Sequence, residues 1–128
     1  MQIDMDLVRE ILLKIEAAPP TKNLITLTDE FQGFSEMAKI SEHLYILGEG
    51  QAGFLEIKEG YRRNGKIIYH AERLTWSGHQ FLADIKSESR WKIVKKKIEE
   101  IGGASLPVWQ QMAAQIGAGL IENALKKG

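Results

Sequence analysis

Residues 52–78, AGFLEIKEGYRRNGKIIYHAERLTWSG, decide the fold of this chain. Apolar, β-branched and aromatic residues in 54–58 and 67–71 predict two short strands. The polar residues 60–66 between them contain an Asn-Gly pair, which is a strong turn signal. The stretch therefore predicts a β-hairpin with a long polar tip.

Amphipathic helices are predicted on the N-terminal side of the hairpin. Asp4 is a typical N-cap for a helix of about three turns, which the prolines at 19–20 bring to an end. Ser35 is the expected cap of a second helix, directly before the hairpin. Residues 21–33 are ambiguous: 24–28 suit a short strand and 29–33 a turn. The predicted buried positions are Met5, Val8, Ile11, Leu12 and Ile15, then Met37, Ile40, Leu44 and Leu47.

Three further helices are predicted after the hairpin. Thr75 caps the third helix, and the fourth begins around Ser87 or Ser89 and ends at the glycines 102–103. Ser105 caps the last helix. The short glycine link predicts that the last two helices pack as an antiparallel helical hairpin. The expected buried positions are Gly78, Phe81, Leu82 and Ile85, then Trp91, Val94, Ile98 and Ile101, then Trp109, Met112, Ala113, Ile116 and Leu120.

The composition is that of one soluble globular domain. The chain has 128 residues, of which 44% are hydrophobic and 27% charged, so intrinsic disorder is not expected. Cysteine is absent, which excludes disulfides, thiolate metal sites and cysteine nucleophiles. No apolar run approaches the roughly 18 residues of a membrane span, and the acidic N-terminus is not typical of a signal peptide. We expect a cytoplasmic protein.

Charge is distributed unevenly although the net charge is zero. Residues 1–34 carry three more acids than bases, residues 35–74 are balanced, and residues 75–128 carry three more bases than acids. Four of those bases, Lys92, Lys95, Lys96 and Lys97, lie close together. Such a run is a solvated helix face or a contact with phosphate or an acidic partner.

Several motifs resemble those of bacterial winged-helix regulators. They are His43-Leu44 with Leu47, Ala52-Gly53-Phe54-Leu55-Glu56, Arg63-Asn64-Gly65 with Tyr69, and Leu74-Thr75 with Gly78. The resemblance implies a mainly α fold with a small β-hairpin (α+β), a winged helix-turn-helix. We expect this domain to cover residues 1–86. A C-terminal helical hairpin over residues 87–128 would pack on it or at a dimer interface.

A second resemblance covers most of the chain. Residues 5–16, 74–82, 91–95 and 102–103 are similar to the bacterial and phage family called domain of unknown function 2513. It implies a winged-helix fold and a phage or prophage setting, and it supplies no activity.

The winged-helix resemblance implies a DNA interface. In such domains the helix before the hairpin enters the major groove, and the hairpin tip touches the flanking backbone. We expect Lys39, Ser41 and His43 to face the groove. The bases expected to hold phosphates are Lys58, Arg62, Arg63 and Lys66. The leading prediction is thus a DNA-binding regulator of transcription.

The alternative function is a protein-interaction module on the same scaffold with no DNA affinity. The acids of residues 36–51 (Glu36, Glu42 and Glu49) and the zero net charge favour it. A homodimer is a further hypothesis, carried by Trp91 and Trp109. All three tryptophans, Trp76 included, are otherwise expected in the core.

Enzymatic chemistry is not expected. The three histidines, His43, His70 and His79, lack metal-binding spacing, although His70 and His79 are near Glu72 in the sequence. There is no phosphate-binding glycine loop and no nucleophile motif. We therefore predict no catalytic residues, no metal and no cofactor.

Overall fold

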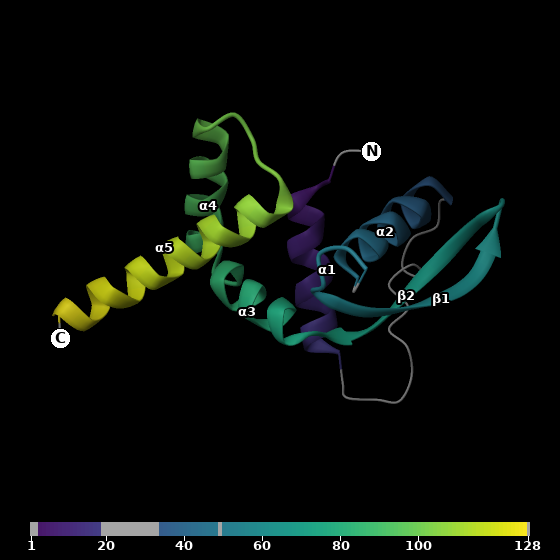
Figure 1. Cartoon of the computed structure of the whole chain (residues 1–128), viewed down its shortest axis with the longest axis horizontal. Coiled ribbons are helices and arrows are strands. Elements are labelled where there is room, and N and C mark those ends of the chain that lie inside the picture. The colour runs from purple at the N-terminus through teal and green to yellow at the C-terminus, as the bar shows by residue number, and fades with distance from the viewer. Residues whose placement is uncertain (1–2, 19–33, 49, 128) are drawn as a thin grey trace. The chain divides into compact units, whose positions relative to one another are not determined.

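The computed structural model describes residues 3–18, 34–48 and 50–127 (Figure 1). Its elements are α1 (Met5–Ala17), α2 (Phe34–Leu47), β1 (Leu55–Arg63), β2 (Lys66–Leu74), α3 (Trp76–Ile85), α4 (Glu88–Glu100) and α5 (Leu106–Lys127). The predicted mainly helical α+β fold with a β-hairpin is confirmed. Of the helices in the described ranges, none is long and apolar enough to cross a membrane. The ambiguous residues 21–33 lie outside the described residues.

Two compact units make up the chain, Met1–His79 and Gln80–Gly128. The boundary lies inside α3, earlier than the division between residues 86 and 87 expected from the sequence. The first unit contains α1, α2 and the hairpin, and the second contains α4 and α5.

Helix α1 begins as its sequence predicts. The Asp4 carboxylate accepts the Leu7 N–H at 3.1 Å and so satisfies one free donor at the helix start. The helix ends at Ala17, and Ala18 has the extended backbone that a residue preceding a proline favours. The apolar stripe is buried at Val8, Ile11, Leu12 and Ile15.

Helix α2 buries the predicted stripe of Met37, Ile40, Leu44 and Leu47. The helix begins at Phe34, so Ser35 lies inside the first turn and is not the N-cap that the sequence predicts. Gly48 follows the helix and forms a parallel bridge with Leu55 at the start of β1. A Cβ on Gly48 would lie 2.7 Å from Ile57 Cδ1, the end of a flexible side chain that would have to shift to make room.

The hairpin is longer and its turn tighter than predicted. Asn64 and Gly65 have positive φ of 50° and 79°, and they form a two-residue turn between paired Arg63 and Lys66. The left-handed conformation of both residues matches the twist of the strands, so the ladder continues to the turn. Gly60 and Tyr61 lie opposite Ile68 in a β-bulge. The predicted long tip loop is therefore wrong.

A tight joint connects the base of the hairpin to α3. Thr75 caps the helix by accepting the Gly78 N–H at 3.1 Å, which confirms the predicted cap. Its hydroxyl also donates to the Gly53 carbonyl, and its N–H donates to Phe54 O at 3.0 Å. A Cβ on Gly78 would overlap the Phe54 carbonyl oxygen. The Ala-Gly-Phe-Leu and Leu-Thr-x-x-Gly motifs therefore form one structural unit.

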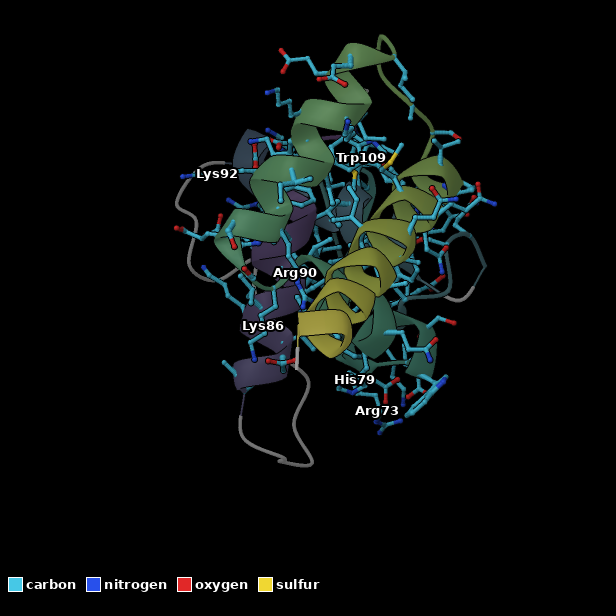
Figure 2. All side chains as sticks on the ribbon, turned by 90° about the vertical axis from the view of Figure 1, so that its left-hand side faces the viewer. Arg73, His79, Lys86, Arg90, Lys92 and Trp109 are labelled. Carbon is cyan, nitrogen blue, oxygen red and sulfur yellow. The ribbon has the colours of Figure 1, made fainter. Side chains whose placement is uncertain are left out.

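The second unit is built on the pair α4 and α5. Ser87 caps α4 by accepting the Arg90 N–H at 3.4 Å. Gly102 and Gly103 end it with positive φ, and the chain then turns back into α5 (Figure 1). The side chains of Trp91 and Trp109 pack with ring centroids 5.3 Å apart, and Trp109 lies between the two helices in Figure 2.

Most of the predicted stripe of α4 is buried, but its last member is not. Trp91, Val94 and Ile98 are buried, whereas Ile101 is 59% exposed. Ile101 follows the last residue of α4 as its C-cap, so helical spacing no longer determines its direction. The predicted burial of Ile101 is therefore wrong.

Candidate nucleic-acid interface

Ser41 is a structural residue of α2 and does not face outward. Its side chain is 3% exposed. The hydroxyl accepts the Tyr69 N–H at 2.9 Å and donates to the Ile67 carbonyl at 3.2 Å. Both groups lie on β2, and Ser41 satisfies them as a neighbouring strand would. The expectation that Ser41 faces a DNA groove is wrong.

His43 is also built into the fold. It is fully buried, its Nδ1 lies 2.7 Å from the Lys39 carbonyl, and its Nε2 accepts the Asp4 N–H at 3.0 Å. The carbonyl can only accept, so Nδ1 carries the proton and the ring joins α2 to the start of α1. His43 therefore cannot contact a groove, contrary to the sequence expectation.

The physical reason for both errors is the width of the buried stripe. Ser41 follows Ile40 and His43 precedes Leu44, so the two polar residues flank the apolar positions on either side. A helix that contacts two neighbours buries more than its apolar stripe, here against β2 and the start of α1. Spacing alone does not reveal the second neighbour.

The exposed face of α2 carries Lys39, Glu42 and Tyr45. Lys39 faces solvent as expected, but its ammonium lies 3.1 Å from the Asp4 carboxylate. Tyr45 packs on Tyr69 of β2 with ring centroids 5.2 Å apart. Among the described side chains of this face, one paired base, one acid and one tyrosine give little attraction for phosphate.

Unlike the described face of α2, the hairpin is rich in exposed basic side chains. Its outer half carries four exposed basic side chains, which we call the cationic tip: Lys58, Arg62, Arg63 and Lys66. Arg63 and Lys66 are cross-strand partners on either side of the turn. Glu59 is the acid among them. The structure thus brings all four predicted phosphate-binding residues onto one hairpin arm.

The cationic tip is connected to α2 through Met37. The Tyr61 hydroxyl lies 3.5 Å from Met37 Sδ, and the Arg63 guanidinium lies 3.7 Å from the same sulfur. In the bulge, the His70 ring packs so closely on Gly60 that a side chain there would overlap it. These contacts orient the arm relative to α2, which runs beside it in Figure 1.

The base of the hairpin is charged too, but its charges are paired. Arg73 forms ion pairs with Glu56 and Glu72. His70 is buried and His79 is exposed. Among the described residues, no group of three His, Cys, Asp or Glu side chains is placed to hold a metal ion.

Trp76 departs most from its predicted position. It is 77% exposed, not buried as expected. The signal was available in the sequence, because Trp76 lies two residues before Gly78. Two residues turn a helix through about 200°, which places the indole opposite the buried face of Gly78, Phe81 and Leu82.

The fold and the arm define a small, mainly helical α+β protein with a cationic hairpin. The chain belongs to the DUF2513 family, since the model described as "Hypothetical protein (DUF2513)" matches residues 2–105. The sequence resemblance to this family is confirmed. An "Uncharacterized protein" of Haemophilus influenzae is 32% identical over 99 residues, which cover 77% of this chain and 80% of that protein. No solved structure was found to match the chain.

Proposed function

We propose that the protein binds double-stranded DNA through the cationic tip of its hairpin, on a winged-helix scaffold. The observation that supports this most is the exposure of all four basic side chains of the tip. Basic side chains that neutralise phosphates supply most of the affinity of a protein for DNA. A regulatory role in a phage or prophage setting is part of the proposal, as the family resemblance implies.

In this proposal the cationic tip contributes more to DNA affinity than α2 does. Ser41 and His43 are engaged inside the fold, and Lys39 is paired with Asp4. Of the described side chains of α2, few remain to form hydrogen bonds with base edges, whereas the cationic tip offers four cations. Because phosphate contacts carry no direct sequence information, we expect binding that is salt-dependent and tolerant of sequence.

The test is the affinity of an Arg62→Ala/Lys66→Ala variant for a labelled mixed-sequence duplex, measured by fluorescence anisotropy at low salt. We expect affinity to fall by about tenfold or more, because the variant can no longer neutralise two of the phosphates. The matched control is Lys14→Ala/Arg73→Ala, which removes the same charge from cations already paired with acids. Equal affinities of the tip variant and the control would reject the proposal.

A second candidate function is protein interaction, and Trp76 favours it. Leu74 is buried, Thr75 caps α3 and Gly78 packs on Phe54, whereas the Trp76 indole among them is 77% exposed. Exposed aromatic side chains with polar surroundings are typical anchors of protein interfaces. A Trp76→Ala variant with unchanged stability and unchanged DNA affinity would leave a protein partner as the explanation of this residue.

A further inference from the structure

The middle of α4 is a run of positive charge in the second unit. Residues 89–98 contain five bases and no acid, and the acids of the helix, Glu88, Glu99 and Glu100, lie at its two ends. Trp91, Val94 and Ile98 are buried on one side. The four lysines of the run are all exposed.

The lysines of the run differ in their surroundings. Lys97 is paired with Glu100 at 3.8 Å. The Lys95 ammonium lies 6.0 Å from the Trp91 ring centroid, and that ring packs on Trp109. Lys92 and Lys96 have neither arrangement: within the described part of the chain, no ion pair is seen for either.

Lys92 and Lys96 form one surface, which we call the α4 lysine face. They are four residues apart, so they lie on the same side of the helix, about 6 Å apart along its axis. Figure 2 shows Lys92 projecting from α4 on the side away from α5. Like charges at this spacing destabilise a helix by about 0.2–0.5 kcal/mol.

The chemistry of this face favours phosphate over a protein surface. Lysine is depleted at protein–protein interfaces, which are enriched in aromatic residues, methionine and arginine. The exposed apolar neighbour on this face is Ile93, which is only 39% exposed. Flexible ammonium groups bind phosphates as point charges without requiring a fixed geometry.

We propose that the α4 lysine face is a second surface for the phosphates of double-stranded DNA, independent of the cationic tip. This inference rests on the proposed DNA-binding function. It assigns phosphate contacts to both compact units of the chain.

The test uses the full chain and a labelled 25-base-pair duplex, with anisotropy titrations at a series of salt concentrations. The slope of log K against log salt falls by about 0.9 for each phosphate that the protein no longer neutralises, so Lys92→Ala/Lys96→Ala is expected to reduce it by nearly two. Affinity at low salt is expected to fall several-fold. Lys14→Ala/Lys97→Ala removes the same charge from lysines paired with acids, and should leave the slope unchanged.

The outcomes separate the two proposals. An unchanged slope in Lys92→Ala/Lys96→Ala, with a reduced slope in Arg62→Ala/Lys66→Ala, overturns the inference and leaves the proposed function intact. The reverse result supports the α4 lysine face and rejects the tip. A wild-type chain that binds no duplex overturns both. Thermal denaturation of each variant verifies that it folds.

Discussion

The two halves of the hairpin use the same two strands for different purposes. At its base, Leu55, Ala71 and Leu74 are buried and Thr75 fixes the hairpin to α3. At the tip, Arg63 and Lys66 are paired across the turn and exposed. Strand pairing is continuous between the halves apart from two bulges. What surrounds a strand, more than its pairing, decides whether a side chain stabilises the fold or is available to a ligand.

The largest effect is expected where the base meets α3. Gly78→Ala would place a Cβ against the Phe54 carbonyl oxygen, which is backbone and cannot easily move. We expect a loss of about 3 kcal/mol in the free energy of unfolding, measured by urea denaturation. Gly50→Ala is the control, because nothing lies within 4 Å of its added Cβ. If both variants were equally stable, the close joint between base and helix would be wrong.

A smaller loss is expected for Ser41→Ala. The substitution leaves the Tyr69 N–H and the Ile67 carbonyl without their partner at the edge of β2. We expect about 2 kcal/mol of destabilisation, again by urea denaturation. DNA affinity of the folded variant should be unchanged. If Ser41→Ala were as stable as wild type but bound DNA more weakly, Ser41 would be a DNA contact and its structural role would be contradicted.

Two carboxylates, Asp4 and Asp84, are expected to make opposite contributions to the free energy of unfolding at neutral pH. The Leu7 N–H and the Lys39 ammonium lower the pKa of Asp4 below 3.8, although burial opposes them. The ionised Asp4 therefore stabilises the fold above that pH, and the contribution is lost as pH falls through the folded pKa. Asp4→Asn keeps a cap but removes the charge, so we expect a loss of at most about 1 kcal/mol at pH 7.

The charge of Asp84 is expected to lower the free energy of unfolding at neutral pH, whereas the charge of Asp4 raises it. Burial raises the pKa of Asp84 above 3.8, and Arg90 only partly offsets it. Ionised Asp84 therefore weakens the fold at neutral pH, and protonation removes this effect in acid. Asp84→Asn should be slightly more stable than wild type at pH 7. Denaturation curves at pH 7 and pH 3 test both variants, and their differences from wild type should shrink at pH 3.

The smallest effect on stability is expected at the tip. Arg62→Ala/Lys66→Ala changes exposed side chains, so the free energy of unfolding should change by no more than about 0.5 kcal/mol. Urea denaturation of this variant beside Gly78→Ala compares the two ends of the hairpin directly. A large loss at the tip would mean that these cations support the fold and would remove the contrast between the halves.

Local signals in the sequence were sufficient for much of the fold. Asp4, Thr75 and Ser87 cap helices because their oxygens satisfy nearby N–H groups, which depends only on neighbouring residues. The apolar stripe of α2 is buried as predicted, and that of α1 is buried except at Met5, because spacing along one helix determines both. The sequence predicts the turn at Asn64 and Gly65, but it predicts shorter strands on either side of the turn than the structure has.

The errors concern side chains whose surroundings come from distant parts of the chain. Ser41 meets β2, and His43 meets the start of α1 thirty-nine residues away in sequence. Neither partner can be inferred from helical spacing. Trp76 is different, since helical periodicity places it opposite Gly78, and only the general tendency of tryptophan to be buried predicts a core position. The exposure of the basic residues of the cationic tip is predictable from the sequence, because hairpin tips are exposed and tolerate charge.

The most direct test of DNA binding is an anisotropy titration of the wild-type chain with a labelled mixed-sequence duplex at 50 mM and 200 mM salt. We expect binding at micromolar concentration or tighter at the lower salt, and at least about tenfold weaker binding at the higher salt, since released counterions drive association. No binding at 50 mM salt, where the electrostatic attraction is stronger, would contradict the account. Trp76 would then be the feature from which to look for a protein partner.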